Sequence, residues 1–262
     1  LDEAIHQLTN RGHGVAAVIE ATQRLRRRGF KVYYHWMPGL PGSSPEHDIA
    51  LTQRLFAEPE FRPDGLKLYP TVVVRGSRLE AWYAEGRYRP GTATEMRDLL
   101  VQIKSLVPPY VRIARLMRDI PPKFILAGCD NLSLRDVIKD RMKELGVSCQ
   151  CIRCREYGHR VRDGWTIGPP HVVRRSYEAL GSTEVMLSYE DERSTLYGLL
   201  RLSLAHRDGG GAGSEPDVAT VRELHVFGPE VSLGGRDSGA AQHRGLGVAL
   251  LGEAAPLSRP PS

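Results

Sequence analysis

Three cysteines within six residues are the feature of this 262-residue chain that points most directly to chemistry. Cys149, Cys151 and Cys154 lie in the segment CQCIRCREYGHR. Three thiolates at this spacing can chelate one soft metal ion, and tetrahedral zinc is the usual choice. We expect structural zinc here, with Cys129 or His159 as the fourth ligand. An iron–sulfur site fits the spacing less well, and unligated surface cysteines are the simplest alternative.

A glycine-containing stretch near the end of the chain predicts a second binding site. Gly245 and Gly247 let the backbone turn tightly and point amide groups at an anion. A helix is expected to begin near Arg244, which brings the positive end of its dipole to the same place. The pattern predicts a pyrophosphate site, and an ordinary glycine-opened helix start is the alternative. The residues concerned form QHRGLG and are Gln242, Arg244, Gly245, Leu246 and Gly247.

Two weaker motifs lie after or within segments that are predicted to be strands. MPGLPG, residues 37–42, contains Pro38 and Gly39 and could present backbone N–H groups to a ligand. Pro-Gly pairs usually mark turns, so a purely structural turn is the simpler interpretation. Lys67 lies in GLKLYP, where a strand lysine is usually an edge residue with its ammonium group in water.

The composition is typical of a soluble globular protein, with 41% hydrophobic and 26% charged residues. The formal net charge is +5, and the excess comes mostly from arginine, whose planar fork suits phosphate. No apolar run is long enough to cross a bilayer, and the N-terminus lacks a signal-peptide pattern. Closely spaced cysteines favour metal in a reducing compartment over disulfides. We therefore expect a cytoplasmic protein without a membrane partner.

The first 107 residues alternate helices with strands, which predicts βα units and a parallel sheet. Strands are expected over residues 30–37 and Gly65–Tyr69. These are too few for a complete barrel, so we expect the chain to be a fragment. Helices are expected over residues 15–28, 44–58 and 92–107. The first is expected to be capped by Thr9 or Asn10 and the second by Ser44 or Pro45. The third has an apolar stripe that consists of Met96, Leu99, Leu100 and Ile103.

An arginine-rich segment occupies residues 108–165. Three of its arginines recur at three-residue spacing, which predicts that they share one side of a short helix. Basic and aromatic side chains near the cysteines predict an RNA-contacting surface, and a solvated basic face is the alternative. The arginines are Arg112, Arg115, Arg118, Arg153 and Arg155, and the aromatic residues are Tyr110 and Tyr157.

After about residue 170 the pattern changes to short strands joined by turns. Strands are expected over residues 183–191, 194–206 and 218–228. The stretch RDGGGAGSEPD between the last two is rich in glycine and polar residues, which predicts a flexible hairpin loop. An antiparallel meander that leads into a glycine-opened helix predicts a separate α+β domain.

Ten motifs in this order closely resemble the Elongator complex protein 3 family. The resemblance extends from about residue 8 to residue 254. Its specificity lies in the number and order of the motifs rather than in any one of them. The motifs are TNRGH, HWMPGLPG, FRPDGLKLYPTVVVRG, RYRP, LVPPYVRIARLMRDIP, CQCIRCRE, LSYED, LLRL, VRELHVFG and QHRGLG.

The resemblance implies an α/β radical S-adenosylmethionine domain followed by an α+β GNAT-type acetyltransferase domain. Residues 1–107 would be the later part of a partial (βα) barrel, and residues 108–165 a basic, zinc-binding linker. Residues 166–262 would be an acetyltransferase domain truncated at its C-terminal end. The cysteines of the family's [4Fe–4S] cluster would lie upstream of Leu1, and the last acetyltransferase strands beyond Ser262. We therefore expect truncation at both ends and weak acetyl-CoA binding.

The resemblance also implies a reaction. The family modifies C5 of the wobble uridine, U34, of tRNA, and uses acetyl-CoA and S-adenosylmethionine in carboxymethylation. Lys67 and His35 would face the barrel interior as candidate catalytic residues, and Pro38 and Gly39 would lie near S-adenosylmethionine. The QHRGLG loop would hold the pyrophosphate of acetyl-CoA. The expected partners are tRNA and either a second copy of the chain, as a homodimer, or Elongator-type subunits.

Two other functions stay open. The chain could be a tRNA-binding zinc module without catalysis, or the activity could be protein lysine acetylation. A basic protein substrate predicts an acidic groove, whereas tRNA predicts an arginine-rich surface. The sequence therefore favours RNA.

Overall fold

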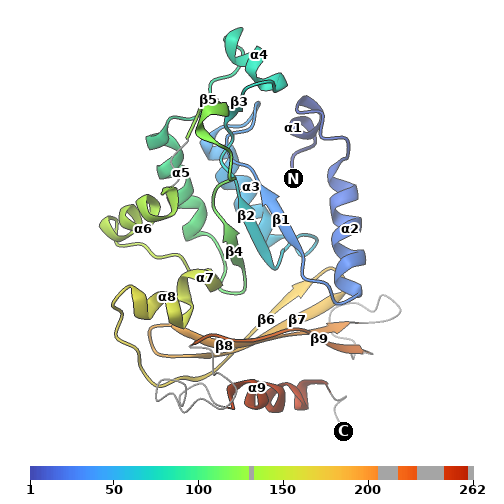
Figure 1. Ribbon diagram of the computed structural model, residues 1–262. Helices are drawn as coiled ribbons and strands as arrows, with labels where there is room; N and C mark the ends of the chain where they lie inside the picture. The colour runs from blue at the N-terminus through green and yellow to red at the C-terminus, as the bar shows by residue number, and fades with distance from the viewer. Residues whose placement is uncertain (130–132, 206–217, 229–244, 259–262) are drawn as a thin grey trace. The chain divides into compact units, whose positions relative to one another are not determined.

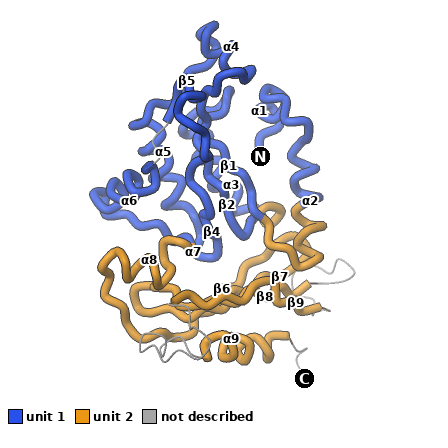
Figure 2. The backbone as a smooth tube through the Cα atoms, in the orientation of Figure 1, with its two compact units in different colours: residues 1–21, 33–58, 62–151 blue, residues 22–32, 59–61, 152–262 orange. Residues whose placement is uncertain are grey.

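A computed structural model describes residues 1–129, 133–205, 218–228 and 245–258 of the chain. The chain divides into two compact units, called here the first and second units (Figure 2). Helix α2 (Val15–Arg27) is shared between them. The first unit contains residues 1–21, 33–58 and 62–151, and the second contains residues 22–32, 59–61 and 152–262.

The first unit is built around three parallel strands in the order β1-β2-β4 (Figure 1). This confirms the predicted parallel sheet. A separate antiparallel pair joins β3 to β5. The elements are α1 (Glu3–Leu8), β1 (Tyr33–Trp36), α3 (Pro45–Ala57), β2 (Gly65–Leu68), β3 (Val73–Val74), α4 (Arg78–Ala84), α5 (Ala93–Ser105), β4 (Arg112–Arg115), η1 (Pro122–Phe124), β5 (Ile125–Ala127) and α6 (Leu134–Glu144).

Helix α3 begins at the predicted cap, and α5 begins at a capping box that we did not predict. Thr92 and Glu95 form a reciprocal capping box at the start of α5, and all four residues of the predicted apolar stripe are buried. The Ser44 hydroxyl accepts a hydrogen bond from the His47 N–H at the start of α3. Thr9 was expected at the start of α2, but it follows α1 as its C-cap.

Strand β4 corrects the helix that we predicted from the spacing of the arginines. Val111 and Ile113 have no exposed surface, and they alternate with the half-buried Arg112 and Ala114, which is the period of a strand. The segment pairs in parallel with β2, so tertiary hydrogen bonding decides its conformation. Consequently the arginines do not share one side of a helix, and Arg118 lies beyond the strand.

The second unit contains an antiparallel sheet in the order β6-β7-β8-β9 (Figure 1). It confirms the predicted meander and adds β6, a strand that we did not expect. The predicted flexible loop between the last two strands lies outside the described residues. The elements are α7 (Ile152–Arg155), α8 (Tyr157–Arg162), β6 (His171–Ala179), β7 (Ser182–Glu190), β8 (Leu196–Ala205), β9 (Val218–Val226), α9 (Leu246–Ala254) and η3 (Pro256–Ser258).

The two faces of this sheet differ in chemistry. Helix α9 packs on one face, where Leu250 belongs to an apolar cluster with residues of β7 and β8. Side chains alternate between faces along a strand, so the intervening residues point the other way. The apolar face carries Val185, Leu187, Leu200 and Leu202, whereas the opposite face buries Glu184, Ser188, Glu190, Arg201 and Ser203.

Candidate functional site

The three closely spaced cysteines form a compact group of thiols. The Sγ atoms of Cys149, Cys151 and Cys154 all lie within 4.8 Å of one another. Cys149 and Cys151 are buried, and Cys154 is half-buried. In a tetrahedral site with Zn–S bonds of about 2.3 Å, sulfur atoms are about 3.8 Å apart, so a small contraction would suit zinc. The donor set fits the predicted metal.

The fourth ligand stays a prediction. Cys129 is buried, but it is not part of the group of thiols that the described residues form. His159 is also outside the group, and its Nε2 atom lies 3.4 Å from the Glu156 carboxylate. Its Nδ1 atom lies 3.2 Å from an Arg162 guanidinium nitrogen. Both ring nitrogens of His159 therefore face other side chains.

Arg155 was predicted to contact RNA, and the structure corrects this. Its side chain has no exposed surface, and Nη1 lies 2.8 Å from the Glu190 carboxylate. A guanidinium enclosed in this way cannot reach a phosphate. The segment RCREYGHR is mostly charged or polar and gave no indication that Arg155 is buried, because its partner Glu190 is on a strand far along the chain.

The other predicted RNA-contacting arginines differ in accessibility. Arg118 is exposed, and Arg112 and Arg153 are half-buried. Arg115 is exposed and donates a hydrogen bond of 2.9 Å to Asp119. These four side chains keep accessible surface, so phosphate contact is sterically open to them.

Among the aromatic residues near the cysteines, the exposed one differs from those that we selected. Tyr110 is buried, and the Tyr157 ring packs 5.1 Å from that of Tyr197. Trp165 is 44% exposed, and its ring lies 3.9 Å from the Arg160 guanidinium. The sequence offered a signal that we did not use, since Trp165 follows an arginine-rich helix directly.

The two candidate catalytic residues lie side by side in the parallel sheet. His35 on β1 and Lys67 on β2 are Cα partners, and Lys67 is in turn the partner of Arg115 on β4. Residues in register on neighbouring parallel strands point to the same face. Partial burial, and then the charge of Lys67, lower the pKa of His35 below its ordinary value. His35 is therefore neutral at pH 7.

A cleft of about 600 Å³ opens in the first unit, within the size range of small-molecule sites. His35, Met37, Leu40 and Asp48 are among its lining residues. The cleft thus includes Met37 and Leu40 of the MPGLPG turn, whereas Pro38 and Gly39 are not among its lining residues. The S-adenosylmethionine site at this turn stays a prediction.

The MPGLPG turn uses its backbone internally. The Gly39 N–H donates a 2.7 Å hydrogen bond to the Asp48 carboxylate, so it is not presented to a ligand as we predicted. The Gly39 carbonyl accepts a 2.6 Å hydrogen bond from the Tyr88 hydroxyl. Gly39 has a φ of +78°, a conformation that favours glycine. Pro38 beside it is buried.

The glycine loop before α9 is described only in part. Gly245 precedes the helix with a φ of +82°, and Leu246 and Gly247 form its first residues. The first turn contains no acidic side chain, which suits an anion at this end. Gln242 and Arg244 lie outside the described residues. The predicted helix start is confirmed, and the acetyl-CoA site stays a prediction.

Known proteins resemble both units. Residues 63–144 match the model of the Radical_SAM C-terminal domain. The chain is 54% identical over 261 residues to the tRNA uridine(34) acetyltransferase of Dehalococcoides mccartyi, and 41% identical over 269 residues to human Elongator complex protein 3. The archaeal Elp3 of Methanocaldococcus infernus, solved with an N-terminal deletion, matches with a TM-score of 0.87 and 38% identity, covering 98% of this chain and 61% of that one.

The chain belongs to the Elongator complex protein 3 family. It covers 57% of the bacterial relative and 47% of the human one, so it spans about half the length of the curated relatives it matches. In the other direction, these alignments cover 99% and 98% of the chain. The family similarity therefore includes the cysteine group and the sheet of the second unit as well as the radical domain.

The family's radical domain match includes β2, α5, β4 and α6. Lys67 and the arginines of β4 lie inside it, whereas the cysteine group follows it. Among the described residues, no helix is long and apolar enough to cross a membrane.

Proposed function

We propose that this chain forms part of an enzyme that modifies C5 of the wobble uridine, U34, of tRNA. The reaction is carboxymethylation that depends on acetyl-CoA and S-adenosylmethionine. The observation that carries the proposal is the 54% identity to a tRNA uridine(34) acetyltransferase over 99% of the chain. That similarity includes the cleft of the first unit, the cysteine group and the start of α9.

The proposed roles in the first unit concern the radical chemistry. His35 and Lys67, which are neighbours across β1 and β2, face the reacting uridine. Pro38 and Gly39 shape the turn beside S-adenosylmethionine, and the proposed cofactors are S-adenosylmethionine and a [4Fe–4S] cluster. When bound, that pair supplies a radical. The neutral imidazole of His35 and the cation of Lys67 then provide a hydrogen-bonding group and a fixed positive charge in one row.

The proposed roles elsewhere are binding roles. Zinc is held by Cys149, Cys151 and Cys154, and the proposed fourth ligand is Cys129, which would have to move toward the group to bind the same ion. Acetyl-CoA is held through its pyrophosphate by the loop that contains Gln242, Arg244, Gly245, Leu246 and Gly247. The tRNA backbone is contacted by Arg112, Arg115, Arg118 and Arg153, with Elongator-type subunits or a second copy of the chain as further partners in the cytoplasm.

The test is tRNA binding by the chain across a salt series, with zinc measured on the same sample. We expect affinity on the order of micromolar that falls steeply with salt, because phosphate contacts release counterions. Arg118→Ala should reduce the slope of log affinity against log salt by about 1. Arg78→Ala on α4, also an exposed arginine, is the matched control and should leave the slope unchanged. Absence of binding, or a flat salt dependence, would contradict tRNA as the substrate.

A tRNA-binding zinc module without catalysis is the second candidate. It is favoured by the location of the binding residues, most of which are accessible or compactly grouped in the described chain. Acetyl-CoA hydrolysis stimulated by tRNA, measured at acetyl-CoA concentrations that offset the expected weak binding, separates the two, since only the enzyme shows it. Competition by a basic lysine-containing peptide would instead support protein lysine acetylation.

A further inference from the structure

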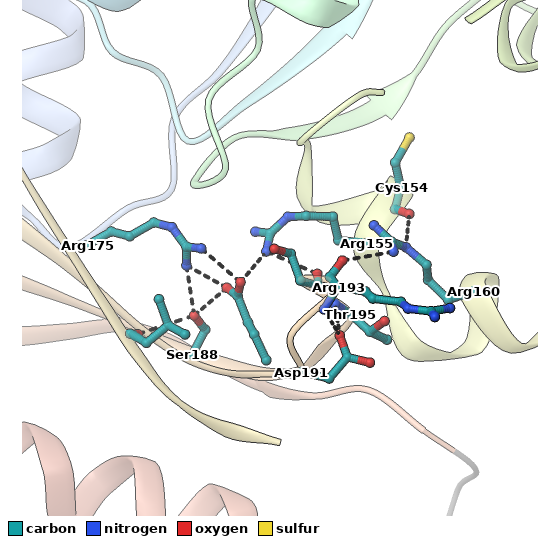
Figure 3. A network of polar contacts seen from close by, with 11 residues as sticks. Cys154, Arg155, Arg160, Arg175, Ser188, Asp191, Arg193 and Thr195 are labelled. Carbon is teal, nitrogen blue, oxygen red and sulfur yellow. Dashed lines mark hydrogen bonds and ion pairs between the residues drawn. The ribbon is translucent and has the colours of Figure 1, made fainter. Parts of the chain in front are cut away.

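Directly after Cys154 in the chain, Arg155 joins a buried carboxylate of the second unit that is shared by two guanidinium groups (Figure 3). Glu190 at the end of β7 is 1% exposed. Arg155 on α7 lies 2.8 Å from Oε2, and Arg175 on β6 donates a 2.8 Å hydrogen bond to the same atom. The Ser188 hydroxyl donates to Oε1 at 2.6 Å. Both carboxylate oxygens are thus hydrogen-bonded.

The same arginine segment also contacts the turn between β7 and β8. Arg155 Nη1 donates to the Ser194 carbonyl at 3.5 Å, and Arg160 Nη1 donates to the Arg193 carbonyl at 3.0 Å. Asp191 fixes this turn by accepting hydrogen bonds from backbone N–H groups within it. The turn therefore offers carbonyl acceptors in set positions.

Cys154 is attached to this network through its main chain. It precedes Arg155 directly, and its carbonyl accepts a 3.4 Å hydrogen bond from Arg160 Nε. In Figure 3 the carbonyl of Cys154 points toward Arg160, whereas its sulfur points away from the network. The network therefore holds the backbone of Cys154, while its Sγ atom lies within 4.8 Å of the other two sulfurs.

We propose that Arg155 and Glu190 are positioning residues for the metal site, because their ion pair holds the α7 turn so that Cys154 is in place before the metal binds. The inference rests on the zinc site of the proposed function. A ligand that is already ordered loses less conformational freedom on binding. By linkage, the metal should also stabilise the sheet of the second unit.

The second guanidinium provides a matched control. Arg155→Met and Arg175→Met each remove one cation from the same carboxylate and leave the other, so Glu190 keeps a partner in both variants. Only Arg155 is continuous with the cysteine segment, since Arg175 is on β6. Arg155→Lys is a milder variant that keeps the charge but loses the planar fork.

The experiment measures zinc affinity of the full chain by competition with a chromophoric chelator. It also records the thiolate-to-cobalt absorption after cobalt(II) substitution. We expect Arg155→Met to weaken zinc binding about tenfold or more, as is usual for outer-sphere partners of metal ligands. Arg175→Met should bind zinc as the unchanged chain does, and Arg155→Lys should lie between. The cobalt spectrum should change in the Arg155 variants alone.

Equal zinc affinity in Arg155→Met and Arg175→Met would overturn the inference. If Arg155→Met does not fold, an unchanged zinc affinity and cobalt spectrum in Arg155→Lys would overturn it. If the unchanged chain binds no zinc, the metal site itself is wrong and the inference falls with it. Loss of tRNA binding with intact zinc affinity would instead count against the proposed function alone.

Discussion

Two buried carboxylates, one in each unit, are stabilised by opposite means. Asp48 in the first unit is 5% exposed and accepts hydrogen bonds from neutral donors, the Gly39 N–H and the Ser43 hydroxyl, both at 2.7 Å. Burial raises its pKa above the ordinary value, and these bonds only partly offset that effect. Glu190 in the second unit is 1% exposed and accepts from two guanidinium groups.

For Glu190, burial alone would raise the pKa, but the Arg175 hydrogen bond and the Arg155 charge outweigh it. The net pKa lies below its ordinary value. Neutral donors therefore leave a carboxylate easier to protonate, whereas cations keep it ionised. Asp48 lines the cleft of the first unit, and Glu190 joins β7 to Arg175 on β6 and Arg155 on α7.

The largest effect should come from Glu190→Gln. It removes the charge that compensates Arg155, which has no exposed surface. We expect a loss of about 3–5 kcal/mol in the free energy of unfolding of the second unit, because an uncompensated charge stays buried. Urea-dependent hydrogen exchange of β7 and β8 peptides measures it. Glu178→Gln, at an exposed position of β6, is the control, and a cost below that of the control would refute the anchoring role.

The apolar face of the same sheet provides a smaller, non-electrostatic reference. Leu250→Ala removes a fully buried side chain from the cluster between α9 and the sheet. We expect a loss of about 2–4 kcal/mol, toward the lower part of the usual range, since a short helix can shift to fill the cavity. Salt should not alter this cost. A strong salt dependence in thermal unfolding would mean that the two faces are not independent.

Each unit also contains a tryptophan whose ring lies against an arginine guanidinium, and this extends the comparison of the units to RNA binding. Trp82 lies 4.9 Å from the Arg87 guanidinium in the first unit, and Trp165 lies 3.9 Å from that of Arg160 in the second. We expect Trp165→Ala to weaken tRNA binding about tenfold without changing the salt slope, because base stacking releases no counterions. Trp165→Phe should restore most of the affinity, and Trp82→Ala should have no effect. Equal losses for both alanine variants would remove the special role of Trp165.

The smallest effect concerns pH. The raised pKa of Asp48 means that its contribution to stability is greatest below the unfolded value, about 3.9, and declines as pH rises through the folded value. Glu190 has the opposite sign, and its contribution is lost as pH falls through its lowered folded pKa. We expect Asp48→Asn to change the free energy of unfolding at pH 7 by less than about 1 kcal/mol. The variant should also lack the loss of stability that accompanies ionisation of Asp48 as pH rises. Hydrogen exchange of α3 peptides from about pH 3.5 to about pH 7, a range that begins near the unfolded pKa, measures this. An unchanged profile would contradict it.

Local sequence patterns predicted the helices and strands whose capping residues and apolar positions lie within the same segment of the chain. The apolar stripe of α5 predicted that helix, and Ser44 predicted the start of α3. Strands β7, β8 and β9 were predicted from their composition. Strand β4 was not, because three arginines at regular spacing imitate a helical face while β2 provides the hydrogen bonds. Strand β6 was missed because most of its residues are exposed or half-buried.

The sequence by itself indicated the thiol group, since Cys149, Cys151 and Cys154 lie within six residues of the chain. It also determined the glycine turn at Gly245, whose left-handed backbone is a local property. Only the tertiary structure decided that Arg155 is internal. Its partner Glu190 is on another element, and a cation can be buried only where the fold brings a compensating charge to it.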